Sequence, residues 1–241
     1  MHAHASIEPL AWESEFFALT SAKLNFSETA PVLTEADLAG WALVQAKIPA
    51  HQTAWADGLA QLGFQLVEGE VDLVLNIGTE CASSQNVSPQ GIRLAVPTDI
   101  PALRAAAARV FTASRFRAPW YDVQDSGRFY AAWIEKAVLG TFDHQCLLAL
   151  DATGQPEGFV SLRDIGNQEM RIGLLAAFPG ASGKGIGARL MAAAIAECRS
   201  LKRLRVATQL GNIAALRLYQ RQGAVIESTS YWLYRGKHDP I

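Results

Sequence analysis

The spacing of hydrophobic positions in the first third of the chain predicts two helices. The first begins after Thr34, a typical N-cap residue, and ends at Pro49, and its helical spacing is carried by Leu38, Trp41, Ala42 and Gln45. The second covers about residues 53–62 and ends at Gly63, since glycine readily takes the left-handed conformation that closes a helix. Residues 7–17 have a mixed pattern, which predicts neither a helix nor a strand.

Residues 63–77 alternate between apolar and polar positions and therefore predict a β-strand. The alternation changes phase at Glu68-Gly69-Glu70, because Phe64 and Leu66 occupy even positions whereas the later apolar residues occupy odd ones. A β-bulge at Gly69 explains this change of phase with the least strain.

The segment 78–90 is polar, rich in small residues and without periodicity, which is typical of a linker. After it, strands and helices alternate. We expect a strand at 92–96, helices at 101–111 (capped by Thr98 or Asp99) and 127–138, and strands at 145–150, 158–163 and 170–176. A Gly-rich turn at 180–187, a helix to about 200, a strand at 204–208, a helix at 212–222 and a strand at 225–234 follow. The prediction is a small N-terminal α/β unit at 1–78, a linker at 79–90 and a second domain at 91–241.

Composition narrows the class of protein. The 241 residues are 50% hydrophobic and 18% charged, which is typical of a globular protein and excludes a disordered chain. The net charge of −2 lacks the basic excess of a general nucleic-acid binder. No secretory signal or membrane-spanning stretch is visible, so we expect a cytoplasmic protein. The three cysteines are Cys81, Cys146 and Cys198, which are far apart and indicate neither a disulfide framework nor a metal site.

The Gly-rich turn is the first candidate for chemistry. Gly183, Gly185 and Gly187 leave backbone N–H groups unobstructed at the start of a predicted helix, and such a nest binds phosphate groups. The loop is not a Walker A motif, because Gly185 follows Lys184, and its last spacing does not fit a dinucleotide fingerprint. On the loop alone, a plain turn that caps the helix explains the glycines equally well.

The order of elements and three motifs resemble the GNAT N-acetyltransferase superfamily over about residues 91–235. The opening strand and helix, Ile92 to Leu103, are similar to the start of that family. The run Gly183-Lys184-Gly185-Ile186-Gly187 resembles its acyl-CoA pyrophosphate loop, with Ser182 where Arg or Gln is usual. A third motif resembles its coenzyme A helix and consists of Asn212, Ala215, Leu216, Tyr219, Gly223 and Ala224.

This resemblance implies an acyl-CoA N-acyltransferase fold, a mixed and mostly antiparallel sheet with flanking helices, preceded by the smaller α/β unit. It implies acetyl-CoA as co-substrate and no metal. The coenzyme A contacts that it implies are the strand residues Leu174, Leu175 and Ala176, the loop residues Gly183, Lys184, Gly185, Ile186 and Gly187, and the helix cap Asn212.

Acetyl transfer to an amine needs an acid for the leaving thiolate and a donor for the oxyanion. Tyr219 stands two turns beyond Asn212 on one helix face, so it can serve as the acid; without the resemblance, a core aromatic explains it better. In the family geometry the donor is a backbone N–H near Leu174 or Leu175, although two leucines also suit an ordinary core strand.

The base is open between several residues. Glu68 stands at the predicted bulge of a hydrophobic strand, where a bulge can direct its carboxylate into a site. Glu70, Asp72 and His144 are the other candidates, and a solvated charge on a strand, or a structural histidine, explains each of them as well. Our hypothesis takes Tyr219 and Glu68 as the catalytic residues.

The loop 114–127 combines guanidinium groups with flat rings, which suits a nucleoside diphosphate; a loop packed on the core is the equal alternative. The candidate substrate-binding residues are Arg115, Arg117, Trp120 and Tyr121. Runs such as SIEPLAWESEFF, QLGFQLVEGEVDL and LRVATQLGN resemble the bacterial dTDP-fucosamine acetyltransferases. That resemblance implies a nucleotide-sugar substrate, acetylated on the 4-amino group of dTDP-4-amino-4,6-dideoxygalactose in enterobacterial common antigen synthesis.

Two alternatives stay open. The chain can be an acetyltransferase of another small amine or of a protein N-terminus, or a non-catalytic acyl-CoA-binding module. A homodimer is also possible, because the predicted last strand carries Tyr231, Trp232 and Tyr234 and can pair through its edge.

Overall fold

The structure is a computed structural model that describes residues 3–78, 90–181 and 183–236. The elements in chain order are β1 (Ala5–Pro9), α1 (Ala11–Phe17), β2 (Ser21–Phe26), α2 (Glu35–Leu38), β3 (Leu43–Pro49), α3 (Thr53–Gln61), β4 (Gln65–Asn76), β5 (Ile92–Leu94), a 3-10 turn (Pro97–Asp99), α4 (Ile100–Val110), α5 (Asp125–Val138), β6 (Gln145–Leu150), β7 (Pro156–Gly166), β8 (Glu169–Ala177), α6 (Ile186–Glu197), β9 (Arg203–Gln209), α7 (Ile213–Arg221) and β10 (Val225–Gly236).

The strands of the described residues form one sheet in the order β1-β2-β3-β10-β4-β9-β8-β7-β6-β5. Neighbouring strands pair antiparallel, except that β2 with β3 and β8 with β9 pair in parallel. This mixed, mostly antiparallel sheet with flanking helices is the fold class that the sequence predicts.

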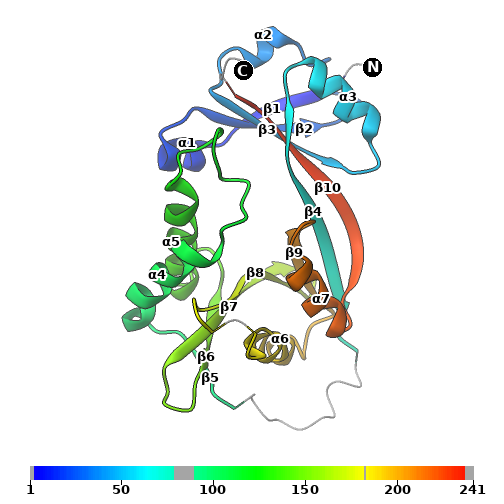
Figure 1. Cartoon of the computed structure of the whole chain (residues 1–241). Helices are drawn as coiled ribbons and strands as arrows, with labels where there is room; N and C mark the ends of the chain where they lie inside the picture. Colours follow the sequence, from blue (N-terminus) through cyan, green and yellow to red (C-terminus); the bar gives the residue numbers. More distant parts are fainter. Residues whose placement is uncertain (1–2, 79–89, 182, 237–241) are drawn as a thin grey trace.

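Helices cover both faces of the sheet around β6, β7 and β8 (Figure 1). On β6, Leu147 and Ala149 pack with α6 on one face, whereas Cys146 and Leu148 pack with α4 and α5 on the other. Because successive side chains of a strand point to opposite faces, this apolar strand supplies two separate cores. Tyr219 of α7 belongs to the core on the α6 side.

Strands from the two predicted domains share the sheet. β10 pairs with β4 on one side and, over Ser230–Gly236, with β3 on the other, so both edges are occupied where Tyr231, Trp232 and Tyr234 lie. A dimer that forms through the edge at these three aromatic residues is therefore wrong as a mechanism, and the oligomeric state stays a prediction. The division into 1–78 and 91–241 also stays a prediction, and the linker lies outside the described residues from 79 to 89.

The predicted helix from Thr34 to Pro49 is wrong after its first turn. Thr34 caps α2 together with Asp37, as the sequence indicates, but the chain then forms β3. This strand lies between β2 and β10, and its first half is buried on both faces, with Val44 on one face and Leu43 and Gln45 on the other. Val44, Ala46 and Ile48 alternate with Gln45 and Lys47, a period of two that indicates a strand, whereas the helix prediction followed the wider spacing from Leu38 to Gln45.

The bulge predicted in β4 exists, but its position at Gly69 is wrong. Trp232 of β10 stands opposite Glu68 and Leu233 stands opposite Leu66, so Val67 is the extra residue. The helix end predicted at Gly63 is confirmed, with α3 closing at Gln61 and Gly63 at a φ of +83°.

The remaining predicted elements are confirmed to within a few residues at their ends, whereas β1, α1 and β2 are missing from the prediction. Asp99 does not cap α4 through its side chain. Its carboxylate instead accepts from the Val96 N–H at 2.8 Å and pairs with Arg93. None of the helices described here is long and apolar enough to cross a membrane.

Candidate active site

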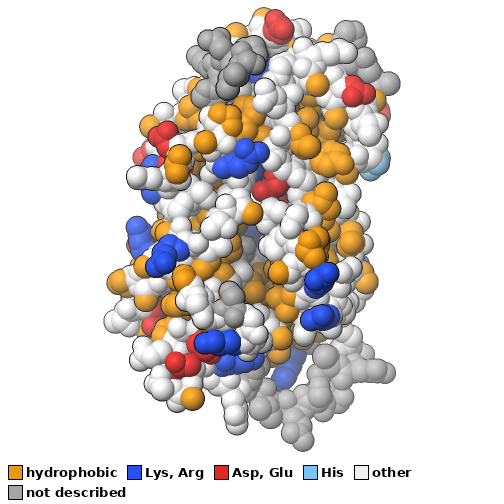
Figure 2. Space-filling model, in the orientation of Figure 1, with side chains coloured by type: hydrophobic (Ala, Val, Ile, Leu, Met, Phe, Trp, Pro, Cys, Tyr) orange, Lys and Arg blue, Asp and Glu red, His pale blue; other side chains and the backbone are white. Residues whose placement is uncertain are grey.

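A cavity opens where β8 and β9 separate. The two strands pair from Glu169–Ile172 against Arg203–Val206, and no pairing follows beyond Ile172. A cavity of about 420 Å³ is lined by residues 173–177 of β8 and 206–209 of β9, which lie at and beyond the last pair of Ile172 with Val206. Its lining includes Leu218 and Tyr219 from the α6 side and Phe129 and Trp133 from the α5 side. The cavity therefore passes from one face of the sheet to the other, and Figure 2 shows the molecule hollowed between these walls.

A β-bulge in β8 produces this separation. Ile172 stands opposite Leu162 and Leu175 stands opposite Val160, so that Gly173 and Leu174 together face Ser161. A bulge bends its strand and increases the local twist, which turns the end of β8 away from β9.

Buried polar groups hold the bulge in place. The Leu174 N–H donates to Ser161 Oγ at 2.9 Å, and Ser161 Oγ donates to Asp143 Oδ2 at 2.5 Å. Trp133 Nε1 donates to the same carboxylate oxygen at 2.8 Å. Asp143 and Ser161 are both 0% exposed. A Cβ atom on Gly173 would overlap this carboxylate and lie 2.8 Å from Ser161 Oγ, so the position has room only for glycine.

The backbone of β8 faces the gap at alternate residues. The Leu174 N–H points to β7, where it meets Ser161, and so does the Phe178 N–H, which donates to the Glu157 carbonyl at 2.7 Å. Consecutive N–H groups of a strand point in opposite directions, so those of Leu175 and Ala177 point toward β9. Of the two predicted oxyanion donors, Leu174 is already bonded, and Leu175 is the one that faces the cavity.

Asn212 and Tyr219 lie together on the other wall. Asn212 caps α7, with its Oδ1 accepting from the Ala215 N–H at 3.2 Å, and its Nδ2 donates to Thr208 Oγ1 of β9 at 3.1 Å. Tyr219 lines the cavity two turns later and is 5% exposed. Burial raises the pKa of the Tyr219 hydroxyl to about 12, so it carries its proton at neutral pH.

The Gly-rich loop adjoins this wall without lining the cavity. Gly183 and Gly185 have φ values of +82° and +77°, and Gly185 is the N-cap of α6. The first bonds of the helix run from Ala188 and Arg189 to the Gly185 carbonyl, so the preceding N–H groups lack helical acceptors. Gly187 allows α6 and α7 to approach closely, because a Cβ atom there would lie 3.0 Å from Leu218 of α7. Lys184 is exposed, and Ser182 lies outside the described residues.

The carboxylates of β4 lie across the cavity from α5, and their surroundings differ. Burial raises the pKa of Glu68 to about 7, partly offset by the charge of Arg115 and increased again by Glu70. Burial acts on Glu70 in the same direction, but hydrogen bonds from Lys47 and Trp232 outweigh it and lower the pKa. Glu68 and Glu70 line the cavity. Of the two, only Glu68 titrates near neutral pH.

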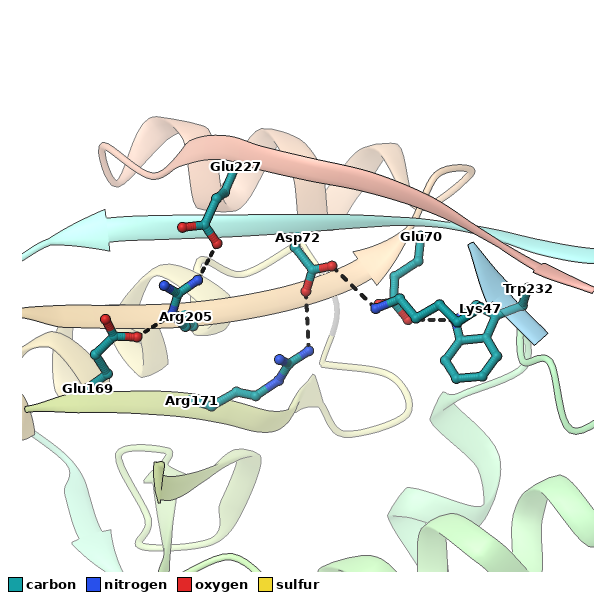
Figure 3. A network of polar contacts seen from close by, with 8 residues as sticks. All are labelled: Lys47, Glu70, Asp72, Glu169, Arg171, Arg205, Glu227 and Trp232. Atoms are coloured by element: carbon teal, nitrogen blue, oxygen red, sulfur yellow. Dashed lines mark hydrogen bonds and ion pairs between the residues drawn. The ribbon is translucent and has the colours of Figure 1, made fainter. Parts of the chain in front are cut away.

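The other two candidate bases lie elsewhere. Asp72 forms ion pairs with Lys47 and Arg171, both at 3.4 Å, and does not line the cavity (Figure 3). His144 is exposed, and its Nδ1 accepts from the Asp164 N–H at 2.9 Å.

Of the four residues proposed for the nucleotide, only Arg115 lines the cavity. Its guanidinium packs 4.0 Å from the ring centre of Trp232 and donates to Gln45 and to the Tyr234 hydroxyl. Arg117 donates to the carbonyls of Val67 and Ala118 and is exposed. The rings of Trp120 and Tyr121 are buried in the core that joins the loop to α1, β3 and β10, because their large apolar surface is better packed there than in water.

The sequence analysis missed part of the lining. Two arginines, Arg163 of β7 and Arg171 of β8, and a group of aromatic side chains, Phe111, Phe116, Phe129, Tyr130 and Trp133, also line the cavity. No signal in the sequence singles out the two arginines, because β7 also carries Glu157 and Asp164 and β8 carries Glu169.

A strand gap beside a Gly-rich helix start, with a buried tyrosine on the next helix, defines an acyltransferase of the coenzyme A-dependent class. The chain belongs to the GNAT acetyltransferase family, whose model matches residues 103–224. Membership of this family implies acetyl-CoA as co-substrate. The chain is 54% identical, over 98% of its length and 100% of the relative's, to a dTDP-fucosamine acetyltransferase from Escherichia coli O6:H1.

Solved structures share the fold. A GCN5-related N-acetyltransferase from Sphaerobacter thermophilus superposes with a TM-score of 0.63 at 16% identity, covering 99% of this chain and 78% of that one. A tandem GNAT protein from the clavulanic acid biosynthesis pathway superposes with a TM-score of 0.58 at 15% identity, covering 92% and 76% of the two chains. Both cover the N-terminal unit as well as the region matched by the family model.

Proposed function

We propose that this protein transfers the acetyl group of acetyl-CoA to the 4-amino group of a dTDP-linked 4-amino-4,6-dideoxygalactose. The observation that carries the proposal is the 54% identity to a dTDP-fucosamine acetyltransferase along almost the whole chain, including the N-terminal unit that holds Glu68. The cavity that crosses the sheet supports it, since two substrates can approach the gap from opposite faces.

Acetyl-CoA binds on the α6 side in this proposal. The N–H groups from Gly183 to Gly187, which precede the first bonds of the helix, and the positive end of the α6 dipole hold its pyrophosphate, with Lys184 as an exposed counter-charge. The pantetheine extends into the gap beside Leu175 and Ala176, and Asn212 lies at its edge. The Leu175 N–H then points at the acetyl carbonyl and stabilises its oxyanion.

The proton transfers follow from the two pKa shifts. Glu68, with a pKa of about 7, accepts the proton of the attacking ammonium group, because a base that titrates near the working pH is both available and effective. The amine nitrogen then bonds to the acetyl carbon and the carbon–sulfur bond breaks. As the amide forms, the nitrogen loses its second proton, which replaces the one that Tyr219 gives to the sulfur. Tyr219, which carries its proton up to about pH 12, donates it to the leaving thiolate.

The direct test measures thiol release from acetyl-CoA by the purified protein with dTDP-4-amino-4,6-dideoxygalactose. We expect turnover with this sugar and little with an amino sugar that lacks the nucleotide. Good turnover of another amine or of a protein N-terminus, without turnover of the nucleotide sugar, would overturn the substrate. Tight acetyl-CoA binding with no turnover of any amine would instead indicate a non-catalytic module.

A further inference from the structure

Three arginines stand in a row across the sheet. Arg163 of β7 is the register partner of Arg171 of β8, which is the register partner of Arg205 of β9. Directly opposed residues share one face of a sheet, on strands about 4.8 Å apart. Like charges in that position destabilise a sheet unless opposite charges surround them.

Only one arginine of this row is fully neutralised by the described residues. Arg205 lies between Glu169 and Glu227 and forms a short ion pair with each (Figure 3). It does not line the cavity. Its positive charge is therefore balanced by carboxylates of the sheet itself.

The other two arginines have weak partners. Arg171 reaches Asp72 at 3.4 Å, and Asp72 is shared with Lys47 at the same distance (Figure 3). Arg163 Nε lies 3.9 Å from Asp143 Oδ1, beyond hydrogen-bonding distance, and neither atom has a partner among the described residues. The Arg163 guanidinium packs instead over the ring of Phe142, 4.7 Å from its centre.

Both under-neutralised side chains line the cavity, on the strands that form its floor, and they are about a third exposed. The charge of Arg171 also lowers the pKa of Glu70, so it acts across the cavity on the wall that holds Glu68. An anion between Arg163 and Arg171 would relieve their mutual repulsion and satisfy the unused donors.

We propose that Arg163 and Arg171 bind the diphosphate of the nucleotide sugar, an inference that rests on the proposed function. Two guanidinium forks suit the oxygens of two adjacent phosphates. A hexose ring separates the amino group from the anomeric phosphate, and Glu68 and the two arginines line one cavity, so the amine can meet Glu68 while the diphosphate meets the arginines.

The nearby carboxylates each have another partner. Glu70, which also lines the cavity, accepts from Lys47 and Trp232. Asp143 lies buried between α5 and the sheet, where its Oδ2 accepts from Ser161 and Trp133 and its Oδ1 stays 3.9 Å from Arg163 Nε. Asp72 still has its ion pair with Lys47 when the guanidinium of Arg171 binds a phosphate. The arginines predicted for this task are less suitable, because Arg115 is held by Gln45 and by aromatic groups and Arg117 lies outside the cavity lining.

Steady-state kinetics of Arg171→Gln, Arg163→Gln and the control Arg203→Gln test the proposal. Arg203 forms an ion pair with Glu169 on the same sheet, is 46% exposed and does not line the cavity. In the control variant, Glu169 still has its ion pair with Arg205. We expect each cavity variant to raise the KM for the nucleotide sugar ~10–100-fold, the range for a lost hydrogen bond between charged groups, with the KM for acetyl-CoA unchanged. The control should keep both values.

A second measurement separates this proposal from the proposed function. Calorimetric titration with thymidine diphosphate alone should show binding to the wild-type protein and ~10–100-fold weaker binding to Arg171→Gln. If the wild-type protein acetylates no nucleotide sugar yet binds the diphosphate through these arginines, the proposed function fails and this inference stands. If Arg171→Gln matches Arg203→Gln in both measurements, the inference fails, whatever the acceptor. If Arg163→Gln does not fold, Arg171→Gln alone decides the test. We expect Arg171→Gln to fold, because Asp72 still has its ion pair with Lys47 in this variant.

Discussion

Replacement of Gly173 by alanine tests whether the buried polar groups hold the gap open. The new methyl group would overlap the Asp143 carboxylate and lie 2.8 Å from Ser161 Oγ, which is closer than real side chains approach. Either Asp143 moves away from Ser161 and Trp133, or β8 shifts out of register. The first outcome loses two hydrogen bonds to a buried carboxylate, at about 1.5–3 kcal/mol each, so the free energy of unfolding falls by about 3–6 kcal/mol.

The loss is large beside the ordinary stability of a folded protein, which is about 5–15 kcal/mol. For a chain of this size it corresponds to a fall in Tm of roughly 6–24 °C, measured by circular dichroism. Gly40→Ala is the matched control, since no atom lies within 4 Å of its added Cβ, and we expect its Tm to stay within about 2 °C. Equal Tm values for the two variants, with wild-type kcat for Gly173→Ala, would refute the argument that this network fixes the bulge.

Three further predictions concern single side chains. Tyr219→Phe should lower kcat ~10²–10³-fold with little change in Tm, because the hydroxyl serves the thiolate and bonds to none of the described residues; a full kcat removes Tyr219 as the acid. Glu68→Gln should remove the rise of kcat/KM centred near pH 7. The folded state favours protonated Glu68, so its contribution to stability is lost as the pH rises from about 4.5 through about 7; a Tm that depends on pH equally in wild type and variant contradicts the shift. Trp120→Ala should cost about 3–5 kcal/mol of stability and leave both KM values of the folded enzyme unchanged, whereas a selective rise in the KM for the nucleotide sugar would return Trp120 to the substrate site.

The features that the sequence predicts well are local. The loop from Gly183 to Gly187, the cap at Asn212 and the position of Tyr219 lie within one stretch of helix, strand and helix. The α-helical repeat alone places Asn212 and Tyr219 on the same face, so no knowledge of the sheet is needed.

The features that it misses depend on which strands are neighbours. Arg163 and Arg171 share a cavity with Glu68 only because β4, β9, β8 and β7 are adjacent, and nothing near β4 in the sequence indicates that β9 pairs with it. The choice between Leu174 and Leu175 likewise depends on the single hydroxyl of Ser161 in a neighbouring strand.

The aromatic residues of the loop 114–124 show why a binding surface is hard to distinguish from a core in the sequence. Trp120 and Tyr121 have the composition of a stacking surface, yet they pack against Phe17 and Tyr234 from the two ends of the described chain. Aromatic rings serve a ligand and a core equally well, and the surroundings that decide between them come from distant segments.

The position of β10 between β3 and β4 has a consequence for the synthesis of the protein on the ribosome. β3 and β4 carry unpaired backbone edges until the strand synthesised last among those described becomes available to both. Exposed strand edges recruit other chains, so the nascent N-terminal half is a natural client for chaperones. A chain released before residue 225 would keep both edges open, and its early loss to aggregation or proteolysis would remove incomplete copies from the cell.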